Sequence, residues 1–550
     1  DGGMQGGSTI TQQLIKNNVL TSWVGETTFI EKVQRKIQEQ YLAIKLEEQV
    51  HDKNWILENY LNTINLGSNT LGVQAAANKY FGKDVSELTL SESAVIAGIT
   101  KNPYGYDPIR FPEANADRRE LVLDAMLRLD YIDKDTYNEA MDDPVYDRIS
   151  SYNMDKGTSY NSYFVDALID DVINDLIMEK GYSESDAYKA LYQGGLTILS
   201  TQDVAIQSVA DEEANNPDNY PMKDKYSFQL SFSVKKADGT TKTYTHQSML
   251  AHYKKANNNP DYSINYASEE EAYAAIEEYE QDMLEEGDTL VEGSESVVIT
   301  LQPQVALTII DQSTGEVKAL TGGRGDKVGN RTWNRATDTS RQPGSTFKIL
   351  STYAPALDLG THTLATTIVD EPWQYSNGTK LKNASGSYMG AISMRTAIQW
   401  SQNMCAVKTI QDITPEVAYE YLEDFGFSTL EKEYDCNEST ALGGLYRGVY
   451  NYELCAAFAA IANSGVYNKP TLYTTILDHD GNVLLESNPE SHTVIKDTTA
   501  ALITSAMRTV VTSGTGTRAA LSNMPVAGKT GTTDHDKDLW FCGYTPYYTC

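Results

Sequence analysis

Residues 341–348 read Arg-Gln-Pro-Gly-Ser-Thr-Phe-Lys and place a serine directly after a Pro-Gly pair, at the start of an expected helix. Three residues along a helix make nearly one turn, so Lys348 is expected on the same face as the Ser345 hydroxyl. An amine beside a hydroxyl can act as its base when burial lowers the pKa of the lysine, because desolvation disfavours the charged form. The pattern alone is weak, since a Ser-x-x-Lys match occurs about once or twice by chance in a chain of this length.

Two further motifs follow in order, Ser-Gln-Asn at 401–403 and Lys-Thr-Gly-Thr at 529–532. A Lys-Thr-Gly tripeptide is expected by chance in only about one chain in eight of this length. Ser401 would relay a proton between Lys348 and a leaving amine, and Asn403 would hold a substrate amide. Small residues in the last motif would let a peptide pair along a strand edge, where the charge and hydroxyls would bind its terminal carboxylate. The residues of that motif are Lys529, Thr530, Gly531 and Thr532.

Together, the three motifs resemble those of the transpeptidase domain of penicillin-binding proteins, over residues 301–550. Asn334-Arg335 and residues 511–520 fit the same resemblance. It implies that a stem peptide ending in D-alanyl-D-alanine acylates Ser345 without a cofactor, and that the acyl group passes to an amine of a neighbouring strand. β-Lactams would acylate the same serine as covalent inhibitors. Backbone N–H groups of Ser345 and Thr532 would form the oxyanion hole.

Four more motifs precede these in the chain, at residues 6–17, 35–47, 56–62 and 118–123. They resemble the second to fifth motifs of the peptidoglycan glycosyltransferases of class A penicillin-binding proteins. The resemblance implies polymerisation of glycan strands from a lipid-linked disaccharide-pentapeptide, with basic residues neutralising the pyrophosphate and a divalent metal such as Mg²⁺ taking part. Glu39 would be catalytic, as the family's second important glutamate. The expected substrate-binding residues are Gln12, Gln13, Lys16, Arg35 and Lys36.

Considered without the flanking motifs, Arg35 and Glu39 have an ordinary interpretation. Residues four apart on a helix are more often a solvated ion pair of little energetic weight. The neighbouring segment at 6–17 favours a site instead.

These resemblances predict an α+β multidomain protein. Residues 1–150 are expected to form a mostly helical, lysozyme-like glycosyltransferase domain without its N-terminal part. Residues 151–300 are expected to be a linker with an acidic insert. Residues 301–550 are expected to form a mixed α/β, β-lactamase-like penicillin-binding transpeptidase domain without its C-terminal end.

Local patterns refine this division. Ile37, Tyr41 and Ile44 recur at near-helical spacing. The acidic run at 269–288 is typical of a solvated helix face or a mobile surface. Two apolar stretches separated by turn residues predict a β-hairpin over 305–323.

Composition excludes several functional classes. The chain has 76 acidic and 44 basic residues and a net charge of −32, which argues against nucleic acid as a partner. No stretch approaches the roughly 18 consecutive apolar residues of a membrane-spanning helix. The 5 cysteines are an odd number without a Cys-x-x-Cys pair, so neither a disulfide framework nor a protein-bound zinc is expected.

The ends of the sequence carry further expectations. The chain starts at Asp1, directly before the 6–17 motif, and stops at Cys550. We expect the family's preceding motif, with its catalytic glutamate, and an N-terminal membrane anchor to lie outside this sequence, so that glycosyl transfer is inactive in this chain. We expect the other end to fall in the strand after the Lys-Thr-Gly motif. The resemblance places the protein at the extracytoplasmic face of the bacterial cell membrane, with nascent peptidoglycan as its partner.

Two alternatives stand beside this interpretation. A hydrolase of the same fold, a β-lactamase or D,D-carboxypeptidase, would need a well-placed deacylating base, and none is recognisable in the sequence. A penicillin-recognising binding or scaffold module would acylate slowly and not turn over.

Overall fold

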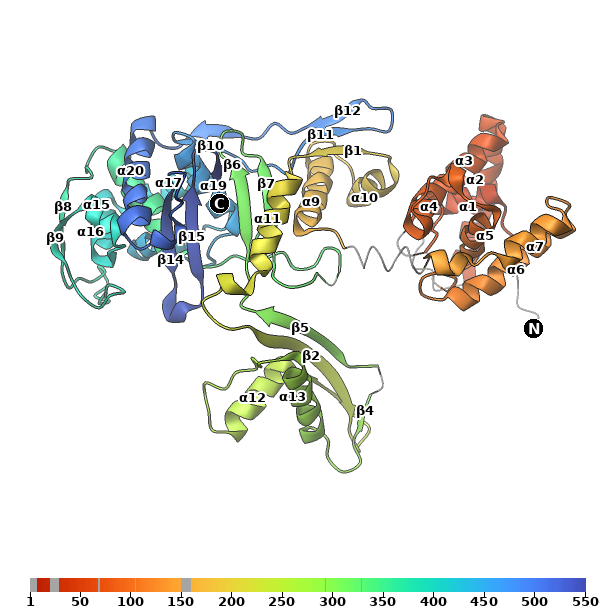
Figure 1. The fold of residues 1–550 in the computed structure, drawn as a ribbon, viewed down its shortest axis with the longest axis horizontal. Helices are drawn as coiled ribbons and strands as arrows, with labels where there is room; N and C mark the ends of the chain where they lie inside the picture. Colours follow the sequence, from red (N-terminus) through yellow and green to blue (C-terminus); the bar gives the residue numbers. More distant parts are fainter. Residues whose placement is uncertain are drawn as a thin grey trace. The chain divides into compact units, whose positions relative to one another are not determined.

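Figure 1 shows the computed structural model of the chain, which describes residues 7–19, 29–67, 70–103, 105–149, 160–291, 293–327 and 329–550. The chain folds into two compact units. The first holds residues 1–159 and 183–196, and the second holds residues 160–182 and 197–550. None of the helices in the described ranges is long and apolar enough to cross a membrane.

The first unit is helical, as predicted. A capping box starts α1, because the side chains of Thr9 and Gln12 each accept from the backbone N–H of the other. Gly82, in the left-handed conformation, ends α4. The helices are α1 (Ile10–Asn18), α2 (Phe29–Val50), α3 (Lys53–Thr63), α4 (Val73–Phe81), α5 (Leu90–Ile99), α6 (Pro112–Arg128), α7 (Lys134–Asp142) and α10 (Glu184–Gln193).

The core of this unit gathers around α4 and α5. Leu66, Tyr80, Val95 and Ile99 are all fully buried there. The Tyr80 hydroxyl donates to the Leu66 carbonyl at 2.6 Å, which satisfies the polar end of a buried ring. Burial of each such side chain stabilises the unit by roughly 1.5–3 kcal/mol.

Helix α2 turns its predicted apolar stripe outward. Ile37, Tyr41 and Ile44 are 60% to 62% exposed, whereas Glu39 on the same helix is fully buried. The spacing therefore predicted the helix correctly, but not the side that faces the interior of this unit.

A five-stranded antiparallel sheet organises the second unit, in the order β14-β15-β16-β6-β7. The predicted hairpin is confirmed, because β6 pairs with β7 from Leu307 opposite Thr321. Strand β14, which carries the Lys-Thr-Gly motif, lies at one edge of the sheet. The strands are β6 (Leu307–Asp311), β7 (Val317–Thr321), β14 (Ala527–Thr532), β15 (Leu539–Tyr544) and β16 (Tyr548–Thr549).

The C-terminal part of this sheet differs from expectation. The strand after the Lys-Thr-Gly motif is β15, and the chain continues beyond it into β16. The expectation that the sequence stops within that strand is wrong, because Tyr548 and Thr549 pair with Asp311 and Ile310 of β6 and so link the hairpin to β15.

Helices pack directly on this sheet. Helix α20 packs along β14, α19 along β6 and α11 along β7. Smaller strand pairs complete the unit: β1 (Thr197–Ser200) with β11 (Tyr473–Leu477) and β12 (Val483–Glu486), β10 (Val466–Asn468) with β13 (Ser491–Thr493), and β8 (Thr367–Asp370) with β9 (Gly390–Ser393). The helices are α9 (Tyr163–Met178), α11 (Val204–Asn215), α14 (Ala354–Asp358), α15 (Met394–Gln399), α16 (Asn403–Ile413), α17 (Pro415–Asp424), α18 (Lys432–Asp435), α19 (Asn451–Ala462) and α20 (Asp497–Ser513).

The predicted linker region is folded in its described part. Helix α9, strand β1 and the segment 225–302 form regular structure, where the sequence analysis expected a linker. Strand β2 (Lys225–Lys235) alternates buried Phe228, Leu230, Phe232 and Val234 with more exposed residues, which is the pattern of a half-buried strand. That alternation was the signal missed in the sequence.

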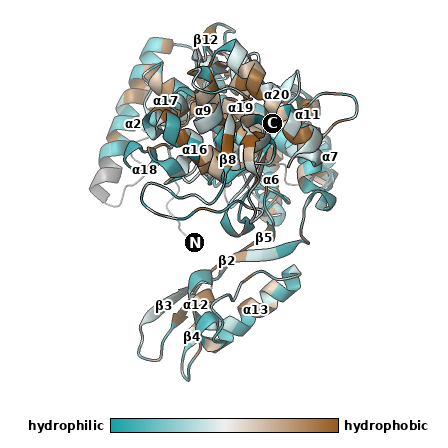
Figure 2. Ribbon diagram, turned by 90° about the vertical axis from the view of Figure 1, so that its left-hand side faces the viewer, coloured by the Kyte–Doolittle hydropathy of each residue, from teal (hydrophilic) through white to brown (hydrophobic). Residues whose placement is uncertain are grey.

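The segment forms a second antiparallel sheet with two helices. Strand β2 pairs with β3 (Thr241–Thr245), β4 (Thr289–Leu290) and β5 (Ser296–Gln302). Helices α12 (His246–Ala256) and α13 (Glu269–Asp282) pack on β2, and Figure 2 shows hydrophilic and hydrophobic residues on both helices. Ala272, Ile276 and Tyr279 are buried, while the glutamates of α13 face mostly outward. The acidic run is thus largely the solvated face of an amphipathic helix.

Candidate functional site

Ser345 lies in a tight 3₁₀ turn, η4 (Gly344–Thr346), that presses against the end of β14. Gly344 has a φ of +55°, and a Cβ atom there would lie 2.8 Å from the Thr532 carbonyl oxygen. A Cβ atom at Gly531 would lie 2.6 Å from the Pro343 carbonyl oxygen. Only glycine permits this approach, which brings the backbone of the serine turn beside that of Thr532.

Lys348 follows one turn later, at the start of the π-helical segment η5 (Lys348–Tyr353). Its side chain is fully buried. Its Nζ donates to Asn403 Oδ1 at 2.6 Å and to the carbonyl and hydroxyl oxygens of Ser401 at 2.5 and 3.2 Å. Within the described chain it makes no hydrogen bond to the Ser345 hydroxyl. The structure therefore brings the first and second motifs together through the amine.

Ser401 lies between two lysines. Its hydroxyl accepts from Lys529 Nζ at 2.9 Å, as well as from Lys348, and Lys529 also donates to the Thr530 carbonyl at 2.8 Å. Ser401 has a φ of +55°, which is uncommon for a residue with a side chain and typical of strained functional positions. All three motifs thus meet at one hydroxyl.

Neither lysine forms an ion pair in the part of the chain that the structure describes. Burial lowers the pKa of Lys348 well below its usual range, and the nearby charge of Lys529 lowers it further. Burial also lowers the pKa of Lys529 to about 7. A lowered pKa favours the neutral amine, which is the state that accepts a proton from a hydroxyl.

The edge of β14 carries the remaining predicted residues. Thr530 is half-buried, Gly531 is buried and Thr532 is exposed. Thr515 Oγ1 lies 2.8 Å from Thr530 Oγ1, which joins the 511–520 stretch to this strand. The sequence analysis missed Thr515 as an individual residue.

Two further polar residues escaped the sequence analysis. Asn383 Oδ1 accepts from the backbone N–H of Asn403 at 2.8 Å, and Asp370 accepts from the Asn383 amide. Neither residue lies at a recognisable spacing from Ser345, so no motif in the sequence identifies them.

In the first unit, three predicted residues lie together on α2. The Glu39 carboxylate is buried and pairs with Arg35, and Lys36 Nζ lies 2.6 Å from Glu39 Oε2. Lys36 also donates to the Ser8 hydroxyl at 2.7 Å, which links α2 to the 6–17 motif. No cluster of three metal-ligating side chains occurs among the residues with described positions.

The other residues predicted from the 6–17 motif have different surroundings. The Gln12 side chain accepts from the Thr9 backbone at 2.8 Å and so caps α1. Gln13 is half-buried and Lys16 is exposed near the C-terminal end of that helix.

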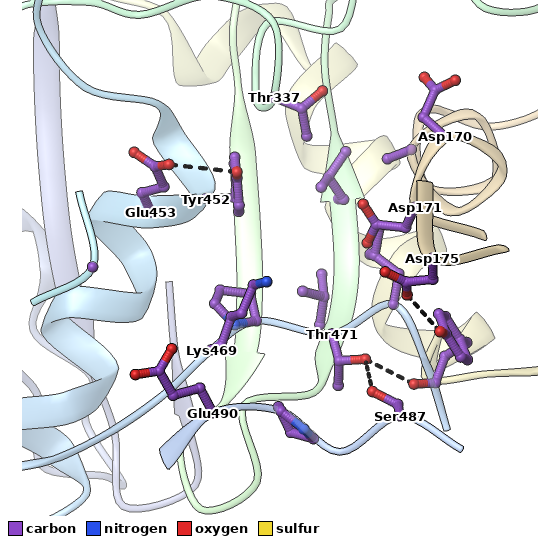
Figure 3. A pocket seen from close by; sticks show the side chains of 18 of the residues that line it. Asp170, Asp171, Asp175, Thr337, Tyr452, Glu453, Lys469, Thr471, Ser487 and Glu490 are labelled. Atoms are coloured by element: carbon purple, nitrogen blue, oxygen red, sulfur yellow. Dashed lines mark hydrogen bonds between the residues drawn. The ribbon is translucent and has the colours of Figure 1, made fainter. Parts of the chain in front are cut away.

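A separate cavity of about 540 Å³ lies elsewhere in the second unit (Figure 3). Asp170, Asp171 and Asp175 line it from α9, and Lys469 and Glu490 line it from the other side. Burial, reinforced by Asp175, raises the pKa of Asp171 to about 7. The cavity contains none of the residues predicted for catalysis.

Comparison with known families agrees with both halves of the chain. The transglycosylase family model matches residues 1–127, and the penicillin binding protein transpeptidase domain model matches residues 305–549.

Curated relatives match along nearly the whole chain. Penicillin-binding protein 1A of Clostridium perfringens (strain 13 / Type A) is 33% identical, over 99% of this chain and 72% of the relative. The protein of the same name from Clostridium acetobutylicum is 32% identical, over 99% of this chain and 61% of the relative. The chain spans 58% of a relative from Clostridium botulinum (strain Hall), so it is well short of the length of several relatives.

A solved structure supports the fold. The crystal structure of penicillin-binding protein 1A from Haemophilus influenzae matches with a TM-score of 0.59 at 21% identity, over 98% of this chain and 82% of that chain. The sequence identities, the two domain models in this order and the arrangement of the three motifs around Ser401 lead to one conclusion: the chain belongs to the class A penicillin-binding proteins.

Proposed function

We propose that the second unit cross-links peptidoglycan by acyl transfer through an acyl-enzyme on Ser345. One observation supports this most directly: the buried amine of Lys348 has no carboxylate partner among the described residues and hydrogen bonds to Ser401 and Asn403. A buried, uncompensated amine is a base near neutral pH, and a structural lysine would normally be paired.

The chemistry follows from these positions. Ser345 Oγ attacks the carbonyl carbon of the penultimate D-alanine as its proton passes to Lys348 Nζ, and the backbone N–H groups of Ser345 and Thr532 stabilise the oxyanion. The C–N bond then breaks, and Ser401 delivers the proton from Lys348 to the leaving nitrogen of D-alanine. An acceptor amine next attacks the ester, its proton returns through the same residues, and Ser345 Oγ is regenerated.

Strand β14 serves as the binding edge in this proposal. An edge strand has unpaired backbone groups, so a stem peptide can add to it as a further strand. Lys529, Thr530 and Thr532 then bind the terminal carboxylate.

The first unit is assigned to glycosyl transfer from a lipid-linked disaccharide-pentapeptide. Arg35, Lys36 and Lys16 would neutralise its pyrophosphate, with Glu39 orienting the first two. A role for Mg²⁺ stays a prediction. The Glu39 carboxylate already accepts from two cations, and it belongs to no group of three His, Cys, Asp or Glu side chains among the described residues, so we assign no step to a metal.

The location follows from the substrates. Lipid-linked precursor and nascent peptidoglycan place the protein at the extracytoplasmic face of the bacterial membrane, with membrane association through an N-terminal anchor. β-Lactams would be covalent inhibitors at Ser345.

Labelling with a fluorescent penicillin tests the proposal. We expect one acyl adduct per chain, mapped to the peptide that contains Ser345, and no adduct in Ser345→Ala. A folded chain that takes no label would contradict acyl transfer and favour a scaffold. Rapid release of the label as hydrolysed penicillin would favour a hydrolase of the same fold.

A further inference from the structure

Asn403 is held by two neighbouring residues from a distant part of the sequence. Its backbone N–H donates to Asn383 Oδ1 at 2.8 Å, and its Nδ2 donates to the Lys382 carbonyl at 2.7 Å. The remaining amide oxygen of Asn403 accepts from Lys348 Nζ at 2.6 Å. The orientation of the Asn403 amide, and with it one of the bonds to the amine, therefore depends on the 382–383 segment.

Asp370 orients Asn383 in turn, together with the Ser387 carbonyl, which accepts from Asn383 Nδ2 at 3.0 Å. Asn383 Nδ2 lies 2.8 and 3.0 Å from the two carboxylate oxygens of Asp370. A carboxylate only accepts, so Asn383 must turn its NH₂ group toward Asp370 and its oxygen toward Asn403. The Met389 backbone N–H donates to the same carboxylate at 2.8 Å and holds it in place.

Both residues are buried, and no cation among the described residues lies near enough to form an ion pair with Asp370. Asp370 is 1% exposed and Asn383 is 5% exposed. Asp370 forms no ion pair within the described ranges. A buried carboxylate without a cation is costly to the fold, so hydrogen bonds such as those from Asn383 and Met389 must hold it.

The charge of Asp370 also acts on the amine. Burial and the charge of Lys529 lower the pKa of Lys348, while Cys405 on α16 and Asp370 at the end of β8 oppose that shift. Removing the negative charge of Asp370 should therefore lower the pKa of Lys348 further.

We propose that Asp370 and Asn383 are positioning residues for acyl transfer: Asp370 orients the Asn383 amide, Asn383 orients Asn403, and Asn403 holds the amine of Lys348 beside Ser401. This inference rests on the function proposed above for Ser345, and it adds two residues that lie outside the three motifs.

The test measures the second-order rate constant of acylation by a fluorescent penicillin from about pH 6 to 9, together with the fraction of chain that is labelled at completion. We expect Asn383→Ala and Asp370→Asn each to lower the rate constant by about ten- to hundredfold with the labelled fraction unchanged. In Asp370→Asn, the rise of the rate with pH should also move to lower pH. Asn377→Ala, at an exposed position in the same loop, is the matched control and should change the rate less than twofold.

A swap variant separates positioning from folding. In Asn383→Asp, two carboxylates face each other, so we expect the largest loss. The double variant Asp370→Asn with Asn383→Asp restores a donor facing an acceptor while keeping an acceptor for the Asn403 N–H. We expect it to recover the rate constant at least tenfold over Asn383→Asp.

The outcomes distinguish this inference from the proposed function. No label in the unsubstituted chain would contradict the proposed function itself. If the unsubstituted chain is labelled, two results would overturn the inference alone. The variants could acylate at the unsubstituted rate, or they could lose only labelled fraction without rescue by the swap.

Discussion

Each unit buries ionisable side chains at its candidate site, but among the described residues these side chains form ion pairs only in the first unit. In the first unit, the buried Glu39 carboxylate pairs with both Arg35 and Lys36. In the second, Lys348 and Lys529 are fully buried with hydroxyl, amide and carbonyl oxygens as their partners. Opposite charges compensate each other in the first site. Uncompensated amines in the second are driven toward the neutral form and become bases.

The largest effect is expected from removing the base. Lys348→Met keeps an unbranched side chain of similar length and buries no charge, so the fold should be retained or slightly stabilised. We expect the rate constant of penicillin acylation to fall about 10³-fold, within the usual range for general base catalysis. Stopped-flow or gel-based labelling would measure the rate constant, with Ser345→Ala as the variant that defines the background without acylation. A loss smaller than tenfold would mean that another group takes the Ser345 proton.

Breaking the compensated site should cost stability. Glu39→Gln removes a buried carboxylate that pairs with both Arg35 and Lys36, and the Arg35 side chain is only 13% exposed. Removing one partner of a buried ion pair costs about 3 kcal/mol or more, so the free energy of unfolding of the first unit should fall by about that amount. Hydrogen exchange of α2 amides would report it. Unchanged protection would show that Glu39 does not compensate the two cations.

The buried lysines of the second unit should make its free energy of unfolding depend on pH. Below about pH 7, Lys529 is protonated in both the folded and unfolded states, and the folded state bears the full cost of the buried charge. Between the folded pKa of about 7 and the ordinary value of 10.5, only the unfolded state holds that proton, so stability rises with pH. We expect a slope of up to about 1.4 kcal/mol per pH unit in this window.

Urea unfolding of the second unit between pH 7 and 8.5 would measure this slope. Lys529→Met should remove the contribution of Lys529 and leave a smaller slope of the same sign from Lys348, whose pKa is also lowered. An equal slope in the variant would assign the pH dependence to another group.

The smallest effect belongs to an exposed pair on the same helix as Glu39. Lys45 and Glu48 lie 2.6 Å apart, but their side chains are 49% and 57% exposed. Solvent screens such pairs, so Lys45→Met should change the free energy of unfolding by less than about 0.5 kcal/mol. This variant is the control for Glu39→Gln in the same exchange experiment. If both variants lowered the free energy of unfolding equally, burial would not explain the effect of Glu39→Gln.

Local pattern was sufficient for part of the fold. The periodicity around Ile37 predicted a helix, and the alternation around Gly315 predicted the hairpin of β6 and β7, because both signals arise within a few residues. The high content of Tyr, Asn, Asp and Glu over residues 151–300 favoured a linker where β2 and the second sheet form. The side of α2 that faces the interior could not be predicted, since it depends on the helices that pack against it.

The sites divide in the same way. The three motifs were enough to nominate Ser345, Lys348, Ser401 and Lys529, because their order along the chain resembles that of a known family although the first motif alone is weak. Three features are decided only when distant segments fold together. They are the presence or absence of counter-ions at the lysines, the close backbone contacts at glycine, and the contact of Asp370 with the site through Asn383. Burial and dielectric surroundings are properties of that packing, and they lower the pKa of an ordinary lysine.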